Sequence, residues 1–350
     1  MAKKNSFRKE KMDFNQELRL LKQRGPERLY LLSGPEDYLR EYYLSELKKL
    51  CLPEGEDSFS YRRLDGPEID LTALREAVDA MPFLSERSFV ELRGPELGKQ
   101  KDPETMLKLL TDLPDYCTVA LVIGSSQELD GRLKLVKGLR AAARSLEFTS
   151  QSQSALTGWI GRRFAAAGKS IDLEAAQQLI FISGDLMNRL IPEIDKIAGF
   201  AKGDRVTIAD VNAVADRIPE AVVFDLTDAV AQKEYNNALG ILAELLSDKH
   251  NEPIPMLAML GMQMQRLYAA RLAVEKELGT KYVMEACDLS HDFIARRLLQ
   301  SARGFSLAQL RRGVELCAEA DYRMKSTGED DAGIFEETVL RIAAGESHAV

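Results

Sequence analysis

The chain has 350 residues, of which 45% are hydrophobic and 29% are charged, and its formal net charge at pH 7 is −8. This composition is typical of a globular protein and excludes the disordered, collagen-like and membrane-spanning classes, because no apolar run approaches the roughly 20 residues that cross a bilayer. The length predicts about two or three domains. The acidic balance argues against a protein that coats nucleic acid by bulk charge, but it leaves room for local basic patches.

The N-terminus and the cysteines predict a cytoplasmic location. Residues 1–12 are basic, but no apolar stretch of signal-peptide length follows them. No two cysteines form a Cys-x-x-Cys pair, which favours reduced and structurally inert thiols. The cysteines are Cys51, Cys117, Cys287 and Cys317.

The first part of the chain alternates between strand-like and helix-like patterns. Segments rich in β-branched, aromatic or leucine residues predict strands at 28–33, 58–64, 88–92, 118–123 and 145–148. Helical patterns lie between them at 36–50, 70–80, 103–113 and 129–144. Repeated strand–helix–strand units predict right-handed crossovers, and therefore an α/β domain with a mostly parallel sheet.

The rest of the chain is predicted to be helical. Strand signals end at about residue 151, and short helices are expected at 156–167, 172–182, 186–201 and 208–217. The last third predicts further helices, most of them longer, at 223–232, 236–247, 253–278, 292–303, 307–325 and 332–344. We therefore expect an α/β domain at 1–149, a small helical domain at 150–218 and a larger all-α domain at 219–350.

The first predicted strand runs into a turn and a helix, which is where nucleotide-binding α/β domains carry a phosphate loop. Counted from Gly34, the second glycine of such a loop falls on Leu39, its lysine on Arg40 and its hydroxyl on Glu41. Leucine crowds the loop and glutamate repels phosphate, so the sequence predicts a degenerate loop that binds no nucleotide. Gly168-Lys169-Ser170 resembles the end of such a loop, but it follows a helical segment and is interpreted as a helix end.

No other pattern indicates a catalytic or metal site. The histidines His250, His291 and His348 have no metal-ligand spacing, and there is no Gly-x-Ser-x-Gly motif. The predicted strands do not end in the paired acidic residues that hold magnesium. We therefore expect neither a catalytic site nor a bound cofactor.

One short segment has two interpretations. After the helix predicted at 70–80, Pro82 breaks the chain direction, and Met81, Phe83 and Leu84 lie together beside it. These apolar residues are either buried under the sheet or exposed as an anchor for another protein, in which each fully buried side chain is worth roughly 1.5–3 kcal/mol.

Two groups of basic residues are candidates for phosphate contact, with a solvated helix face as the alternative. The first group lies in the helix predicted at 129–144 and comprises Arg132, Lys134, Lys137, Arg140 and Arg144. The second lies in the domain expected at 219–350 and comprises Arg296, Arg297, Arg303, Arg311 and Arg312.

These features together resemble the delta-subunit family of bacterial DNA polymerase III, over essentially residues 14 to 345. The resemblance rests on motifs in a fixed order, including LYLLSGPED at 29–37, AMPFLSER at 80–87, GKSI at 168–171, VFDLTDA at 223–229 and DYRMKS at 321–326. It implies an AAA+-like fold whose nucleotide site is lost, which agrees with the broken phosphate loop. It also implies that the domain at 150–218 is a helical lid and that the domain at 219–350 is a collar.

The resemblance also implies a function in DNA replication. Members of this family belong to the sliding-clamp loader, bind the β sliding clamp and open one of its interfaces for loading onto primed DNA. The clamp-binding element of the family matches Met81, Pro82, Phe83 and Leu84, with Arg87 as a supporting residue.

The resemblance implies as partners the motor (gamma/tau) and delta-prime subunits, which the collar joins in a hetero-oligomer; it implies no membrane. ATP is expected to bind to partner subunits and not to this chain. The Ser-Arg-Cys motif of the ATP-binding relatives is absent, which favours the delta family. Two alternatives remain open from the residues: an autonomous AAA+ ATPase, and a helical scaffold with a different client.

Overall fold

The computed structural model describes residues 12–53, 59–83, 85–247 and 251–345. By its internal contacts the chain divides into two compact units. The first comprises residues 1–150 together with 186–188, and the second comprises 151–185 and 189–350. Each unit is described separately below.

The first unit is built on a five-stranded sheet in which every neighbouring pair of strands is parallel. The spatial order is β2-β3-β4-β1-β5. The strands are β1 (Leu29–Ser33), β2 (Tyr61–Asp65), β3 (Ser88–Arg93), β4 (Cys117–Val122) and β5 (Arg144–Glu147). This confirms the predicted α/β class and the parallel sheet.

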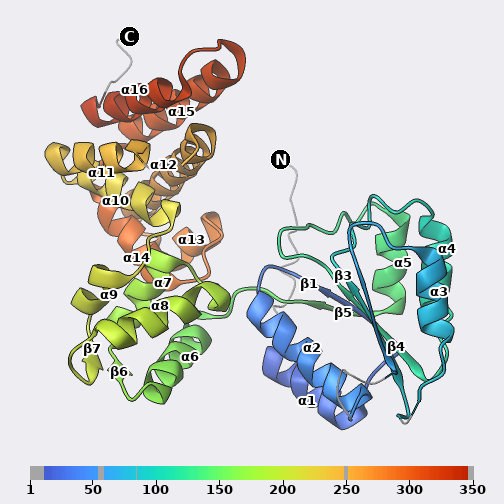
Figure 1. The fold of residues 1–350 in the computed structure, drawn as a ribbon. Helices are drawn as coiled ribbons and strands as arrows, with labels where there is room; N and C mark the ends of the chain where they lie inside the picture. Colours follow the sequence, from blue (N-terminus) through green and yellow to red (C-terminus); the bar gives the residue numbers. More distant parts are fainter. Residues whose placement is uncertain (1–11, 54–58, 84, 248–250, 346–350) are drawn as a thin grey trace. The chain divides into compact units, whose positions relative to one another are not determined.

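Helices cover both faces of this sheet (Figure 1). α1 (Phe14–Arg24) and α2 (Asp37–Cys51) lie on one face, and α3 (Leu71–Asp79), α4 (Pro103–Thr111) and α5 (Lys134–Ala142) lie on the other. Because both faces are covered, the central strands are apolar almost throughout, and all six residues of β4 are buried. The alternation of side chains sends Val90 and Leu92 into the core under α3–α5, and sends Phe89 and Glu91 toward α2.

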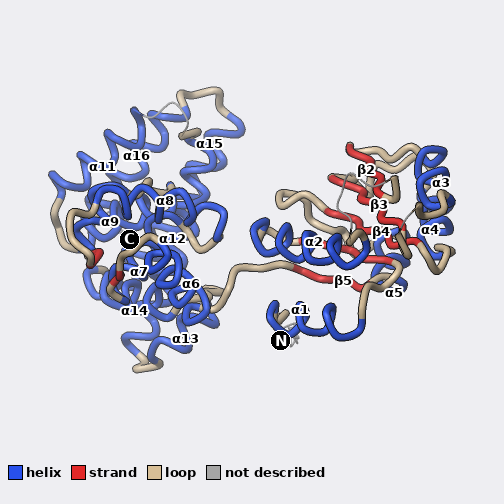
Figure 2. Tube along the Cα trace, turned by 60° about the horizontal axis from the view of Figure 1, so that its bottom comes forward, coloured by secondary structure: helices blue, strands red, loops and turns tan. Residues whose placement is uncertain are grey.

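The second unit is mainly helical (Figure 2). Its helices are α6 (Gln153–Ala166), α7 (Leu173–Ser183), α8 (Met187–Phe200), α9 (Ile208–Val214), α10 (Pro219–Ala231), α11 (Tyr235–Ser247), α12 (Pro253–Glu275), α13 (Gly279–Ala286), α14 (Asp292–Ser301), α15 (Leu307–Ser326) and α16 (Asp331–Ala344). A short 3-10 helix, η1 (Ala302–Gly304), follows α14. The predicted all-helical C-terminal part is confirmed as mostly helical.

Some predicted elements differ from the structure. The strand expected at 58–64 begins only at Tyr61, and the helix expected at 129–144 begins only at Lys134. A two-residue parallel ladder, β6 (Ser170–Ile171) with β7 (Arg205–Val206), lies where no strand was expected. α1 and α13 were not predicted. The division of the second unit into a lid and a collar stays a prediction.

In the part of the chain that the structure describes, no helix is both long enough and apolar enough to cross a membrane.

Substitutions at two glycines of the second unit test how tightly it is packed. A Cβ atom on Gly304 would lie 2.2 Å from the carbonyl oxygen of Ala231, whereas one on Gly240, inside α11, meets nothing within 4 Å. We expect Gly304→Ala to lower the free energy of unfolding by roughly 2 kcal/mol, because backbone has to move. Gly240→Ala should leave it unchanged or raise it by about 0.5–1 kcal/mol. Denaturant unfolding of both variants measures the difference, and equal stabilities would contradict this packing.

Candidate functional site

The segment after α3 exposes its large apolar side chains. Met81 is 79% exposed and Phe83 is 58% exposed, while Pro82 is partly buried between them. The interpretation that Met81 and Phe83 are core residues is therefore wrong. Leu84, the fourth apolar residue of the predicted anchor, lies outside the described residues.

The backbone at Phe83 is held by a buried serine from another loop. The Oγ atom of Ser60 accepts a hydrogen bond from the Phe83 N–H at 2.9 Å and lies 3.1 Å from the Phe83 carbonyl oxygen, to which it donates. Ser60 is only 3% exposed, and its own carbonyl accepts from the Phe89 N–H at the start of β3. The exposed segment is thus tied to the sheet through its backbone, which leaves its side chains free to contact a partner.

Arg87 points back toward the sheet. Its guanidinium lies 3.4 Å from the Asp115 carbonyl oxygen and 3.5 Å from Thr118 Oγ1 on β4. These contacts join the end of the exposed segment to β4, and the supporting role of Arg87 stays a prediction.

Phe59 belongs to the same exposed surface, although it was predicted to lie inside a strand. It is 75% exposed, and its ring meets that of Phe83 edge to face, with centroids 6.1 Å apart. A signal was present in the sequence, because the segment SFSYRRL places two aromatic residues at alternate positions ahead of a charged pair. That alternation was interpreted as a strand face.

The phosphate-loop position after β1 is closed by its own residues. Gly34 has φ +108°, and a Cβ there would lie 2.2 Å from the carbonyl oxygen of Phe148. The Glu36 N–H, which a phosphate loop would direct at its ligand, donates to that same oxygen at 3.1 Å. Arg40 donates to the Gly34 carbonyl at 2.7 Å and pairs with Asp37. The guanidinium at the lysine position therefore binds the loop itself.

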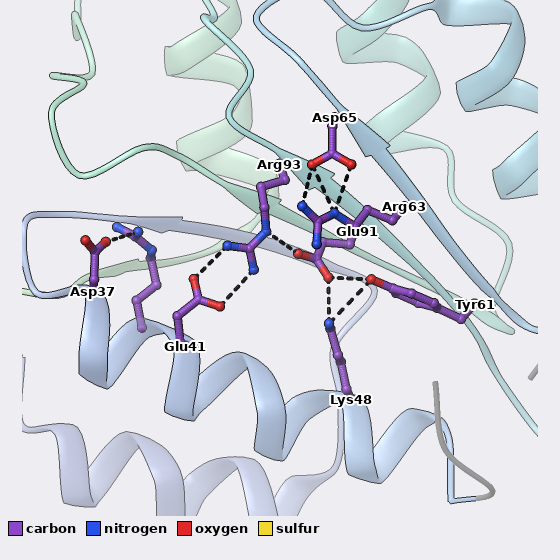
Figure 3. A network of polar contacts seen from close by, with 9 residues as sticks. Asp37, Glu41, Lys48, Tyr61, Arg63, Asp65, Glu91 and Arg93 are labelled. Carbon is purple, nitrogen blue, oxygen red and sulfur yellow. Dashed lines mark hydrogen bonds and ion pairs between the residues drawn. The ribbon is translucent and has the colours of Figure 1, made fainter. Parts of the chain in front are cut away.

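A second set of ion pairs joins α2 to the sheet (Figure 3). Arg93, at the end of β3, binds both carboxylate oxygens of Glu41 at 2.8 Å, and its Nε atom donates to Glu91 at 2.6 Å. The other Glu91 oxygen accepts from Lys48 at 2.7 Å and from the Tyr61 hydroxyl at 2.9 Å. Buried Glu91 is thus held by two cations and a hydroxyl.

The ionised form of Glu91 is the favoured one. Burial acts to raise its pKa, but the hydrogen bonds from Lys48 and Arg93 outweigh burial and lower it. The carboxylates of Glu41 and Glu91 raise the pKa of Arg93, chiefly through the hydrogen bonds that Arg93 donates to Glu41. Glu91 and Arg93 are therefore both charged at neutral pH.

These residue types do not fit a magnesium-bound nucleoside triphosphate. Such a site needs a hydroxyl at position 41 and a carboxylate at the end of β3, with magnesium between them. Here Glu41 and Arg93 occupy those two positions and pair directly with each other. The Glu41 carboxylate thus stands where the hydroxyl is needed, and the Arg93 guanidinium stands where the carboxylate is needed.

The second resemblance to a phosphate loop is a helix end, as predicted. Gly168 has φ +75° and, with Lys169, closes α6 through N–H bonds to Ala165 and Phe164 in the Schellman pattern. The Lys169 ammonium donates to the carbonyl oxygens of Ala201 and Gly203 at 2.7 and 2.8 Å. The Lys169 ammonium therefore binds backbone carbonyls of its own unit and is not directed at a phosphate.

The basic residues of the first group do not share one helix face. Lys134, Lys137 and Arg140 are exposed on α5 at three-residue spacing. Arg132 precedes the helix and pairs with Asp130 at 2.9 Å. Arg144 lies in β5 and binds Glu17 of α1 at 2.6 Å. The prediction that Arg132 and Arg144 lie in the same helix as the other three was wrong, and a contact of these residues with DNA stays a prediction.

The collar arginines are mostly engaged in local contacts. Arg297 lies over the ring of Phe181, 4.1 Å from its centroid, and bonds Gln178. Three others pair with carboxylates of their own helices. Arg296 pairs with Asp292, Arg311 pairs with Glu315, and Arg312 pairs with Glu315 and Glu319. Arg303 is exposed. A DNA-binding role for these residues stays a prediction.

No metal or thiol chemistry is indicated where the structure can be described. Within those residues no three His, Cys, Asp or Glu side chains are placed to hold a metal ion together. All four cysteines are free, and burial raises the pKa of Cys51 to about 11 and that of Cys317 to about 12. Such thiols stay protonated, in agreement with the predicted inert cysteines.

The network around Glu91 predicts the effect of removing its lysine. Lys48→Met leaves a fully buried carboxylate with one cation fewer, so we expect a loss of roughly 3 kcal/mol in the free energy of unfolding at pH 7. The deficit should shrink in acid. The lowered pKa of Glu91 means that its stabilising contribution is present above the ordinary value of 4.5 and is lost as the pH falls through its folded value.

A matched control lies one residue further along α2. Lys49 is exposed and pairs only with Glu46, so Lys49→Met should change stability by less than about 1 kcal/mol. Urea unfolding of both variants between pH 3 and pH 7, a range chosen around the glutamate pKa, checks both expectations. Equal losses for the two lysines, or a Lys48→Met deficit that does not depend on pH, would contradict the buried network.

Comparisons with known proteins agree on one family. Residues 30–149 match the family described as "DNA polymerase III, delta subunit", and residues 220–342 match "DNA polymerase III delta subunit, C-terminal domain". These two parts of the same subunit together cover more than half of the chain.

Two proteins that are described as delta subunits of DNA polymerase III match this chain over most of their length. The chain is 26% identical over 321 residues to the DNA polymerase III subunit delta of Bacillus subtilis (strain 168), covering 89% of this chain and 91% of that protein. It is 24% identical over 281 residues to the probable DNA polymerase III subunit delta of Aquifex aeolicus (strain VF5), covering 77% of each chain.

A solved structure shares the fold. The Bacillus subtilis DNA clamp loader delta protein matches with a TM-score of 0.53 and 24% identity, over 95% of this chain and 100% of that one. Taken with the matches to both parts of the subunit, this similarity shows that the chain belongs to the DNA polymerase III delta-subunit family.

Proposed function

We propose that this chain is the clamp-loader subunit that binds the β sliding clamp and opens one of its interfaces for loading onto primed DNA. The observation that carries the proposal is the exposed apolar segment at Met81–Phe83, where two large apolar side chains have more than half of their surface exposed. An exposed cluster of this kind on a rigid support is typical of a protein-binding anchor.

The chemistry of the first unit supports binding without catalysis. The positions that would hold a nucleotide are occupied by Arg40, Glu41 and Arg93, which pair with neighbouring groups of this chain. The subunit would therefore act through binding free energy alone, and ATP would act in the motor subunits beside it. Such a binder opens a ring only as far as it prefers the open form to the closed one.

The C-terminal helices offer a surface for joining those subunits. α10, α11 and α16 border an apolar hollow of about 350 Å³, in which Tyr235, Leu239 and Leu340 are each 42–49% exposed. We propose that this part of the chain packs against motor (gamma/tau) and delta-prime subunits in a cytoplasmic hetero-oligomer. We also propose that Lys134, Lys137 and Arg140, which are exposed on α5, contact DNA phosphates in that assembly.

Removal of the anchor should abolish clamp binding. We expect Phe83→Ala to weaken binding to the clamp of the same organism by at least about tenfold, because a buried phenylalanine side chain is worth roughly 1.5–3 kcal/mol. The double variant Phe83→Ala/Leu84→Ala should weaken it further. Equilibrium binding of the purified full chain to immobilised clamp measures both.

Phe200→Ala is the matched control for this experiment. Phe200 is 53% exposed but lies in α8 of the other unit, so its removal should leave clamp binding unchanged. Wild-type binding that survives Phe83→Ala would move the anchor elsewhere. No binding by the folded wild-type chain would remove the proposed function.

The closed phosphate loop predicts that the isolated chain does not bind ATP. An equilibrium titration with a fluorescent ATP analogue and magnesium should show no saturation up to about 1 mM, which corresponds to a binding free energy of about −4 kcal/mol. Saturable binding at lower concentration would favour an autonomous ATPase instead.

A further inference from the structure

We infer that the turn Phe59–Ser60, just before β2, is a second part of the clamp-binding surface: Phe59 contacts the clamp, and Ser60 is a positioning residue for Phe83. This inference rests on the proposed function. It extends the anchor from one segment after α3 to two loops that are separated by more than twenty residues in the sequence and meet at one edge of the sheet.

Exposure is the first argument for Phe59. Among the described residues of the first unit, only Phe59, Met81 and Phe83 are large apolar side chains with more than half of their surface exposed. Phe59 is 75% exposed, more than Phe83 itself. An isolated exposed apolar residue needs no explanation, but three of them gathered in one place indicate an interaction surface.

Contact with Phe83 is the second argument. The two rings meet at an interplanar angle of 88° with centroids 6.1 Å apart, which is a favourable edge-to-face geometry. A clamp surface that receives Phe83 therefore comes up against Phe59 as well. Because the pair is already packed in the free subunit, less side-chain freedom is lost when the clamp binds.

Ser60 supplies the positioning. Its hydroxyl is bonded to both backbone groups of Phe83 at 2.9 and 3.1 Å. It also lies 2.7 Å from Ser85 Oγ, which in turn is 2.9 Å from the carbonyl oxygen of Arg87. One buried hydroxyl thus joins the start of β2 to both sides of position 84. Ser60 is 3% exposed and contacts the clamp only through Phe83.

The test of Phe59 uses clamp binding by the full chain. We expect Phe59→Ala to weaken binding by at least about fivefold at unchanged melting temperature, and Phe59→Leu to restore most of the loss, since the role is apolar contact. Phe200→Ala is again the control. If Phe83→Ala abolishes binding while Phe59→Ala stays within about twofold of wild type, this inference fails and the proposed function stands. If neither substitution weakens binding, the proposed anchor fails with it.

The test of Ser60 is a double-mutant cycle, because a loss of affinity alone would not distinguish positioning from general damage. Ser60→Ala should weaken clamp binding by about threefold to tenfold in the wild-type chain, and by much less when Phe83→Leu is already present. Equal losses in both backgrounds would overturn the positioning role. If Ser60→Ala lowers the melting temperature, Ser60→Cys provides the cycle, because it keeps the size of the buried side chain and weakens its hydrogen bonds to the Phe83 backbone.

Discussion

The parallel direction of all five strands determines where this protein can carry a function. In a parallel sheet, every loop that leads into a strand lies at one edge, and every loop that leaves a strand lies at the opposite edge. Strands of four to six residues separate the two edges by roughly 13–20 Å. The apolar surface of Phe59, Met81 and Phe83 precedes β2 and β3, whereas the phosphate-loop position follows β1 and Arg93 ends β3. The proposed clamp contact and the closed nucleotide position therefore lie at opposite edges.

Because the two edges are separate, the residues at the nucleotide position can differ from those of a nucleotide site without any change in the apolar surface at the other edge. At the carboxyl edge, Arg40 is directed back onto Gly34, and Arg93 is held between Glu41 and Glu91. The charges that a nucleotide and magnesium would otherwise balance are balanced within the chain, so the fold keeps its shape with no ligand. The amino edge depends instead on backbone hydrogen bonds through Ser60, which do not involve those charges.

The sequence predicted the elements whose patterns are local and strong. Buried parallel strands such as β1 and β4 are continuous apolar runs, and they were placed within one residue of their observed ends. The start of α5 was missed because Asp130 accepts from the Arg132 N–H and forms a turn where a helix was expected. The β6–β7 ladder has only two residues in each strand and carries no periodic pattern.

The candidate site shows the same limit. Met81 and Phe83 were found from their own segment and from the family resemblance, but whether they were buried or exposed was not decided by composition. Phe59 was missed because Tyr61 and Leu64, which follow it, belong to a true strand. The predicted strand was therefore started too early and included the turn that holds Phe59. The Glu41–Arg93 pair joins residues 52 positions apart, so no local sequence pattern predicts it and it is found only in the folded structure.

A rigid anchor has a thermodynamic consequence for the proposed clamp opening. Apolar side chains that enter a pocket far from the clamp interface contribute equally to the closed and the open ring, so they supply affinity and no opening. Under the proposed function, opening requires a second contact that exists only in the open form, and we propose that α3, which leads directly into the anchor through Ala80, makes it. The hydroxyl of Ser60 then gains a role beyond affinity. By fixing the backbone of Phe83 to the start of β3, it would fix a bound clamp relative to α3. Only a fixed geometry lets binding free energy at one contact act against the closed interface at another.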